Sequence, residues 1–316
     1  MESPPDGSSD SPVAVTATRT TADAQASSRS AGAVLQDYLL LAKPEISSVV
    51  TLSAFAGFLV GSPAGLDGGT LFWAMLGTAL CAGGVGMLNH VFERRYDAQM
   101  KRTADRPLPD GRVDPDRARD VGVLLVCAAV GVLCPLVNAL TAVLAALTAV
   151  LYLFVYTPLK RETKWNTLIG TVPGALPALG GYTAATGHLG TGGWAMFGIL
   201  AAWQMPHFLS LAWMYRKDYE RGDYAMLPVV EPDGDSTAAQ MIGFAALLVP
   251  VSVLPVLTGA AGWIYGVGAV PLGLWFLWTT IVFNGERTGQ KARRVLKASV
   301  LYIPALVALL LVDWFV

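Results

Sequence analysis

The chain has 316 residues, of which 53% are hydrophobic and only 14% are charged, and its net charge is −1 at pH 7. A soluble protein of this length would carry roughly a quarter charged residues, so the composition argues against a soluble enzyme and favours a protein embedded in a lipid bilayer. Positive and negative charges almost balance, which argues against a nucleic-acid partner.

Residues 1–36 are rich in Ser, Ala, Thr and Asp and contain no apolar run, so we expect a disordered N-terminal tail before a membrane domain at 37–316. A secretory signal would contain a hydrophobic segment, which this tail lacks. A mitochondrial transit peptide would be poor in acidic residues, whereas the tail contains Glu2, Asp6, Asp10 and Asp23. These features favour the cell (inner) membrane of a bacterium.

The remaining sequence consists mainly of apolar runs that are long enough to cross a membrane. We predict an all-α integral membrane protein, with about nine transmembrane helices in a bundle around a central cavity. The first run is short and can begin earlier, near Tyr38, with a kink at Pro44. The predicted helices are at 46–60, 71–92, 121–137, 139–156, 168–185, 194–214, 238–257, 263–283 and 298–315.

The connections between these helices alternate in charge. All 22 Lys and Arg residues lie in the N-terminal segment before the first predicted helix or in the connections near 93–120, 157–167, 215–237 and 284–297. The other connections, near 61–70, 138, 186–193 and 258–262, contain none. Because positive loops stay on the cytoplasmic side, the pattern predicts a cytoplasmic N-terminus and places every charged motif on the cytoplasmic face.

The first such motif begins at the end of the second predicted helix. Asn89, Glu93 and Asp97 recur every fourth residue, so their side chains follow one face of an α-helix. A group of cations comes directly after them, consisting of Lys101, Arg102 and Arg106. Mg²⁺ takes oxygen ligands from a few carboxylates together with substrate phosphates, so this stretch predicts a site for Mg²⁺ and a polyphosphate. The alternative is a solvated basic loop.

A second charged motif follows the sixth predicted helix. Its carboxylates are Asp218 and Asp223, and its cations include Arg216 and Lys217. Two acidic clusters on two helix ends could hold metal ions on opposite sides of one diphosphate. These residues can also be ordinary charges at the membrane surface.

Two histidines lie within or next to apolar runs. His207 lies inside a predicted span, where ionisable residues usually have a function, and imidazole is a common haem ligand. A histidine that is simply hydrogen-bonded within the bundle is the alternative. His90 adjoins Asn89, and ligand and structural roles are both open for it.

A third motif, Tyr156-Thr157-Pro158-Leu159-Lys160-Arg161, brings further cations to the same face. The next helix contains Pro173 and Pro177 among several glycines. Irregular backbone at membrane depth is tolerated where it faces protein or a cavity, so this region predicts either a substrate chamber or a kink for packing.

The N-x-x-x-E-x-x-x-D pattern at 89–97, followed by MKRTADRPLP, resembles the N-x-x-x-D-x-x-x-D signature of the UbiA-type intramembrane prenyltransferase superfamily. QMPHF, KDY followed by MLPVV, and YTPLKR followed by GALPALGGY resemble its haem O synthase branch, the protohaem IX farnesyltransferases. The resemblance extends from about Tyr38 to the C-terminus. Two positions depart from the family pattern: Glu93 stands where aspartate is usual, and Asp223 where a small residue is usual.

The resemblance implies transfer of a farnesyl group from farnesyl diphosphate to a vinyl group of haem b, with addition of water. It implies that Mg²⁺ is held by Asn89, Glu93, Asp97 and Asp218, with Asp223 as a further candidate. The cations that would bind the diphosphate are Lys101, Arg102, Arg106, Lys160, Arg161 and Lys217.

In the same resemblance, His207 and His90 would hold haem, and catalysis would depend on Asn89, Glu93, Asp97, Lys101, Arg102 and Asp218. Implied partners are the two substrates, the lipid bilayer, and a downstream haem A synthase or oxidase assembly factors. Two alternatives stay open at this point: prenylation of another ring, such as a quinone or chlorophyll precursor, and a haem carrier without chemistry.

Overall fold

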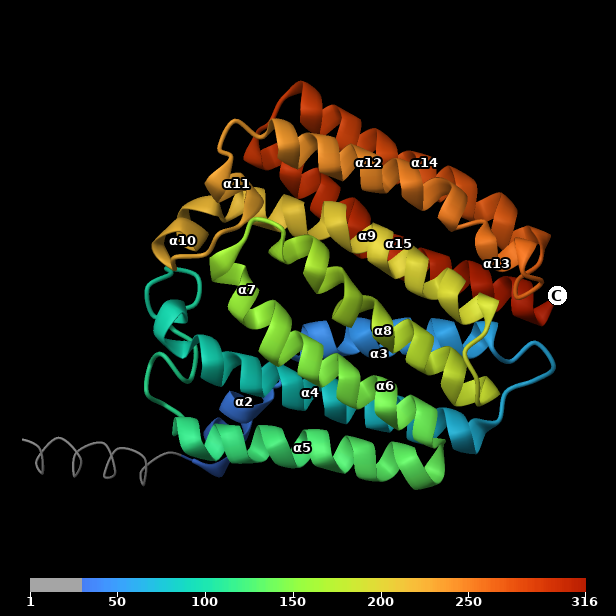
Figure 1. The fold of residues 1–316 in the computed structure, drawn as a ribbon, viewed down its shortest axis with the longest axis horizontal. Coiled ribbons are helices and arrows are strands. Elements are labelled where there is room, and N and C mark those ends of the chain that lie inside the picture. Colours follow the sequence, from blue (N-terminus) through green and yellow to red (C-terminus); the bar gives the residue numbers. More distant parts are fainter. Residues whose placement is uncertain (1–29) are drawn as a thin grey trace, which may run out of the picture.

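The computed structural model describes residues 30–316, so residues 1–29 of the predicted tail at 1–36 lie outside the described residues. The described chain forms α-helices and one π-helix, with no strand between residues 30 and 316. Most helices run along a common direction and form one bundle (Figure 1).

The elements in chain order are α2 (Ala31–Leu41), α3 (Pro44–Val60), α4 (Gly68–Asp97), α5 (Pro115–Leu136), α6 (Ala139–Val150), the π-helix η1 (Leu151–Tyr156), α7 (Thr157–Glu162), α8 (Asn166–Thr186), α9 (Thr191–Met214), α10 (Arg216–Arg221), α11 (Leu227–Val230), α12 (Asp235–Val251), α13 (Leu254–Leu257), α14 (Trp263–Gly285) and α15 (Gly289–Phe315).

Among the described residues, seven helical segments are long and apolar enough to cross a membrane, and the bent pair α2–α3 makes an eighth. The remaining predicted span, at 168–185, corresponds to α8, which has 21 residues and contains Pro173 and Pro177. Its composition is not apolar enough for it to be counted with the others. The all-helical prediction is therefore confirmed, whereas the count of nine and the cytoplasmic N-terminus stay predictions.

Several helices begin earlier than the apolar runs suggested, because capping residues start them in polar sequence. Asp114 accepts a hydrogen bond from the Arg117 backbone N–H, so α5 begins at Pro115. Thr288 caps α15 in the same way, so that α15 begins at Gly289, nine residues before the predicted start at 298. Ser30 caps α2, which therefore includes the last residues of the predicted tail.

The first span is broken at Lys43, as the sequence suggested, and α2 and α3 are bent by 51°. Lys43 has a left-handed backbone, with φ 51°, and Pro44 is the first residue of α3. In residues 30–316, the other non-glycine residue with positive φ is Asp223, with φ 56°. A left-handed non-glycine residue is costly and usually persists at a functional position. The left-handed backbone therefore suggests that Lys43 has a functional role.

Helices α3 and α8 cross with their backbones in direct contact. A Cβ on Gly57 would lie 1.9 Å from the Ala178 carbonyl oxygen, and a Cβ on Gly181 would lie 1.7 Å from the Ala54 carbonyl oxygen. Small residues permit this close approach between helices in a membrane. The crossing holds α3, the second part of the broken first span, closely against α8.

We expect Gly181→Val to destabilise the protein by at least about 1–3 kcal/mol, because the new side chain would overlap backbone that cannot rotate away. Thermal unfolding of the purified protein in detergent, followed by tryptophan fluorescence, measures the change. Gly243→Val is the matched control, since a Cβ on Gly243 meets nothing within 4 Å. Equal unfolding temperatures for the two variants would contradict the close crossing.

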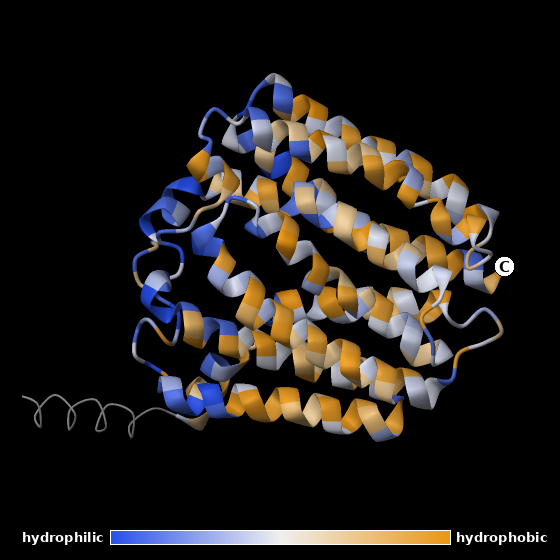
Figure 2. Cartoon of the chain, in the orientation of Figure 1, coloured by the Kyte–Doolittle hydropathy of each residue, from blue (hydrophilic) through white to orange (hydrophobic). Residues whose placement is uncertain are grey.

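Hydrophilic residues gather at one end of the bundle, where the connection from α4 to α5, the end of α7, and α10 lie (Figure 2). Helices such as α5 and α14 carry orange, apolar residues along most of their length. The clustering of charge that the sequence predicted is thus present at one end, and the candidate site lies there.

Candidate active site

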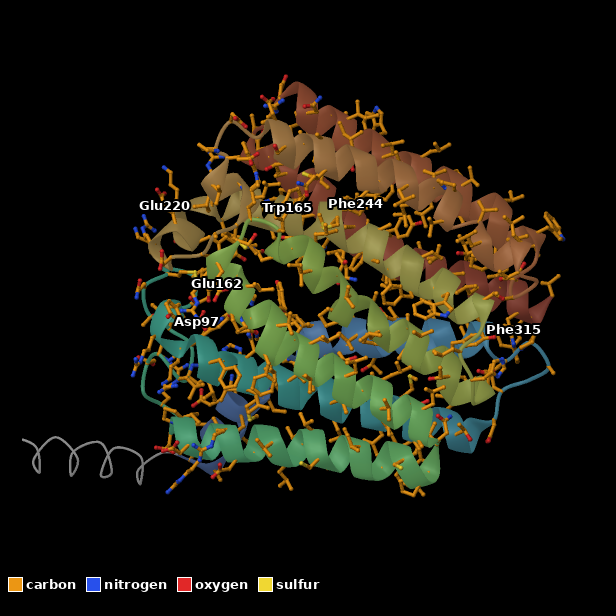
Figure 3. The ribbon with its side chains drawn as sticks, in the orientation of Figure 1. Asp97, Glu162, Trp165, Glu220, Phe244 and Phe315 are labelled. Atoms are coloured by element: carbon orange, nitrogen blue, oxygen red, sulfur yellow. The ribbon has the colours of Figure 1, made fainter. Side chains whose placement is uncertain are left out.

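A cavity of about 540 Å³ opens at the hydrophilic end of the bundle. Its walls come from α4, the α2–α3 break, η1, α7, the loop after α4, and the region around α10. Asp97, Glu162 and Glu220 lie at this end of the molecule, whereas Phe315 lies at the other (Figure 3). The ends of α4, α7 and α10 therefore meet on one side of the bundle, as the charge pattern predicted.

The predicted row of oxygen-bearing side chains lies along α4 and faces this cavity. Asn89, Glu93 and Asp97 all line it, and they are only 1%, 8% and 1% exposed. Helix α4 continues without a break to Asp97, so the four-residue spacing does place the three residues on one face. Such burial of two carboxylates requires compensating positive charge.

Each of the three residues is held by a cation from a different element. Lys43, at the α2–α3 break, donates to Asn89 Oδ1 at 2.6 Å. Lys160 of α7 lies 2.8 Å from Glu93 Oε1. Arg106, in the loop after α4, lies 2.8 Å from Asp97 Oδ2. The cavity thus contains a row of oxygens and a facing row of cations, each at hydrogen-bonding distance from its partner.

Threonine hydroxyls fix the orientation of this row. Asn89 Nδ2 donates to Thr157 Oγ1 at 3.2 Å, and the Thr157 hydroxyl donates to the Tyr152 carbonyl oxygen at 2.8 Å. Thr103 donates to the Asp97 carbonyl oxygen at 2.8 Å. Thr157 directly follows η1, and π-helical turns occur frequently at functional sites. The wider turn precedes Lys160, which belongs to the site.

Aromatic rings surround the cations. The Lys160 ammonium lies 4.7 Å from the Tyr156 ring centroid and 5.8 Å from that of Tyr152. The Arg102 guanidinium lies 4.9 Å from the Tyr215 ring. Such contacts stabilise cations out of water. In the loop before α11, burial raises the pKa of the Tyr224 hydroxyl well above its usual value, so Tyr224 stays a hydrogen-bond donor at the edge of the cavity.

His90 also lines the cavity and is 3% exposed. Within residues 30–316, neither of its ring nitrogens has a hydrogen-bond partner, and Nδ1 lies 3.7 Å from Asp97 Oδ2. Buried polar atoms without partners are rare in native structures and call for an explanation. A ligand in the cavity would provide the missing partner, which favours the ligand role over the structural one.

The structure does not bring the second acidic cluster into the cavity. Asp218 accepts a hydrogen bond from Arg221 at 2.9 Å, and Asp223 is exposed in the turn after α10. Neither lines the cavity, although Tyr219 and Tyr224 beside them do. In the described residues, no three His, Cys, Asp or Glu side chains converge on a metal position.

Some of the predicted diphosphate-binding cations line the cavity and others do not. Arg102, Arg106 and Lys160 line the cavity. Lys101 and Lys217 are exposed and do not line it. Arg161 turns the other way, toward Tyr96, with its guanidinium 4.2 Å from that ring.

His207 does not line the cavity, although the next residue, Phe208, does. Its Nδ1 lies 2.8 Å from Ser299 Oγ on α15, and its ring stacks on Trp203 with centroids 5.0 Å apart. Trp203 in turn donates to the Ser299 carbonyl oxygen at 2.9 Å. These contacts join α9 to α15 and favour the role of a histidine hydrogen-bonded within the bundle over that of a haem ligand.

We therefore expect His207→Leu to lower the free energy of unfolding by about 1 kcal/mol, as for one lost buried hydrogen bond, and to leave haem binding unchanged. Thermal unfolding and the absorption spectrum of added haem b measure the two quantities. His90→Leu serves as the comparison for haem binding. Loss of the bound-haem spectrum in His207→Leu, at full folding, would restore the haem-ligand interpretation.

Lys43 is the main site residue that sequence reasoning missed. In the charge pattern it counts only as one of the cations before the first predicted helix, although it stands inside a broken apolar span and directly before Pro44. A lysine at a break between two helical runs is a signal that it can face a cavity rather than solvent. Tyr152 could also have been found, because it precedes Tyr156 and Lys160 at the same four-residue spacing.

The model of the UbiA prenyltransferase family matches residues 50–310, which is most of the chain. The chain belongs to the UbiA prenyltransferase family. This UbiA-family protein is accordingly a multi-pass membrane protein and an enzyme that transfers prenyl groups.

Curated relatives and solved structures agree with this assignment. A protoheme IX farnesyltransferase of Salinibacter ruber is 89% identical over 282 residues, covering 89% of this chain and 100% of the relative. The protoheme IX farnesyltransferase of Solibacter usitatus is 44% identical over 288 residues, covering 88% of this chain and 99% of the relative.

Among solved structures, a UbiA homologue from Archaeoglobus fulgidus bound to DMAPP and Mg²⁺ has a TM-score of 0.63 at 16% identity, covering 87% of this chain and 99% of that one. The apo structure of a UbiA homologue from Aeropyrum pernix has a TM-score of 0.70 at 18% identity, covering 85% and 98%. These two structures show that the fold is shared.

Proposed function

We propose that this UbiA-family protein transfers the farnesyl group of farnesyl diphosphate to a vinyl group of haem b, with addition of water, and so forms haem O. The observation that carries the proposal is the paired row in the cavity: Asn89, Glu93 and Asp97 on α4, each held by its own cation. The protoheme IX farnesyltransferases that resemble the whole membrane domain support the choice of substrates.

The paired row is suited to a magnesium-loaded diphosphate. Asn89, Glu93 and Asp97 offer the amide and carboxylate oxygens that Mg²⁺ prefers, and the A. fulgidus homologue is described as bound to Mg²⁺. When bound, Mg²⁺ would neutralise charge on the diphosphate oxygens. Asp218 and Asp223 lie outside the cavity in this structure, so the α4 row is the primary metal-binding set and Asp218 a secondary candidate.

The cations of the cavity are suited to a diphosphate. Lys43, Lys160 and Arg106 each hold an oxygen of α4 in the structure, and each could also donate to a diphosphate oxygen in the same cavity. Arg102 adds a fourth positive charge to the cavity wall. These groups stabilise the negative charge that develops on the departing diphosphate, and such preorganised stabilisation is often the largest catalytic effect.

The acceptor half of the reaction takes place beside the same row. As the allylic C–O bond breaks, the first carbon of the farnesyl group forms a bond with the terminal vinyl carbon of haem b. Water then adds to the adjacent carbon and loses a proton, which leaves a hydroxyethylfarnesyl group. His90, whose ring nitrogens have no hydrogen-bond partner within residues 30–316, is the residue that we assign to haem binding here.

We further propose that the protein spans the bacterial cell membrane with this cavity on the cytoplasmic side. All Lys and Arg residues of the membrane domain lie in the connections at one end of the bundle, or beside them, as the positive-inside rule requires. Haem O would then be passed to a haem A synthase or to oxidase assembly factors.

The test uses the full-length protein in lipid nanodiscs with haem b, farnesyl diphosphate and Mg²⁺. We expect the haem extracted afterwards to gain the mass of one farnesyl group plus one hydroxyl group, and we expect EDTA to abolish the gain. An aromatic acid such as 4-hydroxybenzoate is the competing acceptor. Prenylation of that acid with unchanged haem would overturn the proposal, and bound haem that is always recovered unchanged would indicate a carrier.

A further inference from the structure

A second cavity, of about 100 Å³, adjoins the first one inside the bundle. The two cavities share Lys43, Ile46 and Tyr152 in their walls. Away from these three residues, the second cavity is lined by apolar and small side chains and by a few hydroxyl-bearing ones, with no further charged residue among the described ones. Its position and its chemistry suit the hydrocarbon chain of a substrate whose diphosphate lies at Asn89.

The second cavity runs along α4, which provides part of its wall. Val85 and Cys81 continue the four-residue row of Asn89 away from the charged end, and Ala82 and Thr78 lie beside them on the wall. From Asn89 to Thr78 the helix rises about 16 Å at about 1.5 Å per residue. An extended chain advances about 1.2 Å per backbone bond, so the twelve main-chain carbons of a farnesyl group, about 13 Å in length, fit within this depth.

The far end of the cavity is closed by Leu133 of α5, which is 0% exposed. Leu133 lies directly over Gly77, where an added Cβ would be 2.5 Å from the leucine side chain. The hydroxyls of Thr141 and Thr183, 3.0 Å apart, fasten α6 to α8 at the same end. The buried Leu133 side chain therefore closes the end of the cavity, and it packs against Gly77, which has no side chain.

We propose that Leu133, packed on Gly77, sets the length of the isoprenoid chain that the enzyme accepts, at three isoprene units. This inference rests on the proposed function, because it assigns the second cavity to the chain of the prenyl diphosphate. Longer chains meet the Leu133 side chain, and shorter chains leave part of the apolar wall without contact.

The decisive experiment offers the full-length protein an equimolar mixture of geranyl, farnesyl and geranylgeranyl diphosphates with haem b, and measures the product masses. In Leu133→Ala we expect the ratio of geranylgeranyl to farnesyl product to rise at least about tenfold, since one or a few methylenes in an apolar pocket change selectivity by about 10- to 200-fold. Leu136→Ala, on the same helix but 45% exposed, should keep the wild-type ratio.

A second variant makes the cavity shorter instead of longer, and it adds a side chain rather than removing one from the core. Ala82 lies seven residues before Asn89, so a larger side chain there leaves a depth of about 10 Å. We expect Ala82→Phe to shift the ratio of farnesyl to geranyl product at least about tenfold toward geranyl. This variant decides the question if Leu133→Ala does not fold.

Unchanged product ratios in folded Ala82→Phe and Leu133→Ala would overturn the assignment of Leu133, while farnesylation of haem by the wild-type protein would leave the proposed function standing. Failure of the wild-type protein to prenylate haem with any of the three diphosphates would instead overturn the proposed function. The two failures are therefore distinguishable in one set of measurements.

Discussion

Replacing Asp97 with asparagine should reduce the rate of prenyl transfer by about a hundredfold to a thousandfold, the range for loss of one preorganised charged group. Asp97 is 1% exposed and lies 2.8 Å from Arg106. The amide keeps the size of the side chain but removes the negative charge that would bind Mg²⁺ and position Arg106. The rate of haem O formation at saturating farnesyl diphosphate, titrated with Mg²⁺, measures the effect.

Asp116→Asn is the matched control for Asp97→Asn. It makes the same chemical change at the charged end of α5, where the Asp116 side chain is 78% exposed and pairs with Arg119. We expect this variant to retain the wild-type rate. A folded Asp97→Asn enzyme with the Mg²⁺ dependence and rate of the control would show that the α4 row does not hold the metal.

Lys43→Met should reduce the rate by about a hundredfold, because the cavity loses one of the cations that stabilise the departing diphosphate and Asn89 loses its 2.6 Å partner. A change in both KM for farnesyl diphosphate and kcat is expected, since the ammonium acts on the bound substrate and on the leaving group. Steady-state kinetics over a range of farnesyl diphosphate concentrations separate the two parameters.

Lys43→Gly separates the backbone of Lys43 from its charge. Glycine adopts the left-handed conformation without steric cost, so this variant should be as inactive as Lys43→Met but unfold at a higher temperature than that variant. Lys43→Arg, which keeps a cation, should recover part of the rate. If Lys43→Gly were as active as the wild-type protein, Lys43 would serve only to form the bend.

The α4 half of the site could be predicted from sequence because it depends on one helix. Asn89, Glu93 and Asp97 need only an unbroken helix to face the same direction, and the apolar run before them made that helix easy to recognise. The family resemblance added the identity of the substrates, and the relatives support it. The cations Lys160 and Arg106 were also predicted, since they follow motifs that end at the same face.

The rest of the site depends on how separate elements are oriented, which spacing along the chain does not determine. Lys43 reaches Asn89 across 46 residues, and only the left-handed bend before α3 aims it there. Helix α10 has six residues, too few for a reliable apolar face, and in the structure Tyr219 rather than Asp218 faces the cavity. The sequence leaves open whether His207 binds haem or is hydrogen-bonded within the bundle, and only the structure shows that its ring contacts both α9 and α15.

The one-to-one matching of oxygens and cations in the cavity limits how this region can change during evolution. Loss of Lys160 alone would remove the ion-pair partner of the buried Glu93 carboxylate, and breaking a buried ion pair costs about 3–5 kcal/mol, before any effect on the reaction. Loss of Glu93 alone would remove the ion-pair partner of Lys160 in the same way. Descendants that alter this cluster should therefore carry compensating substitutions at both members of a pair, and intermediates with one change should be selected against at the level of folding.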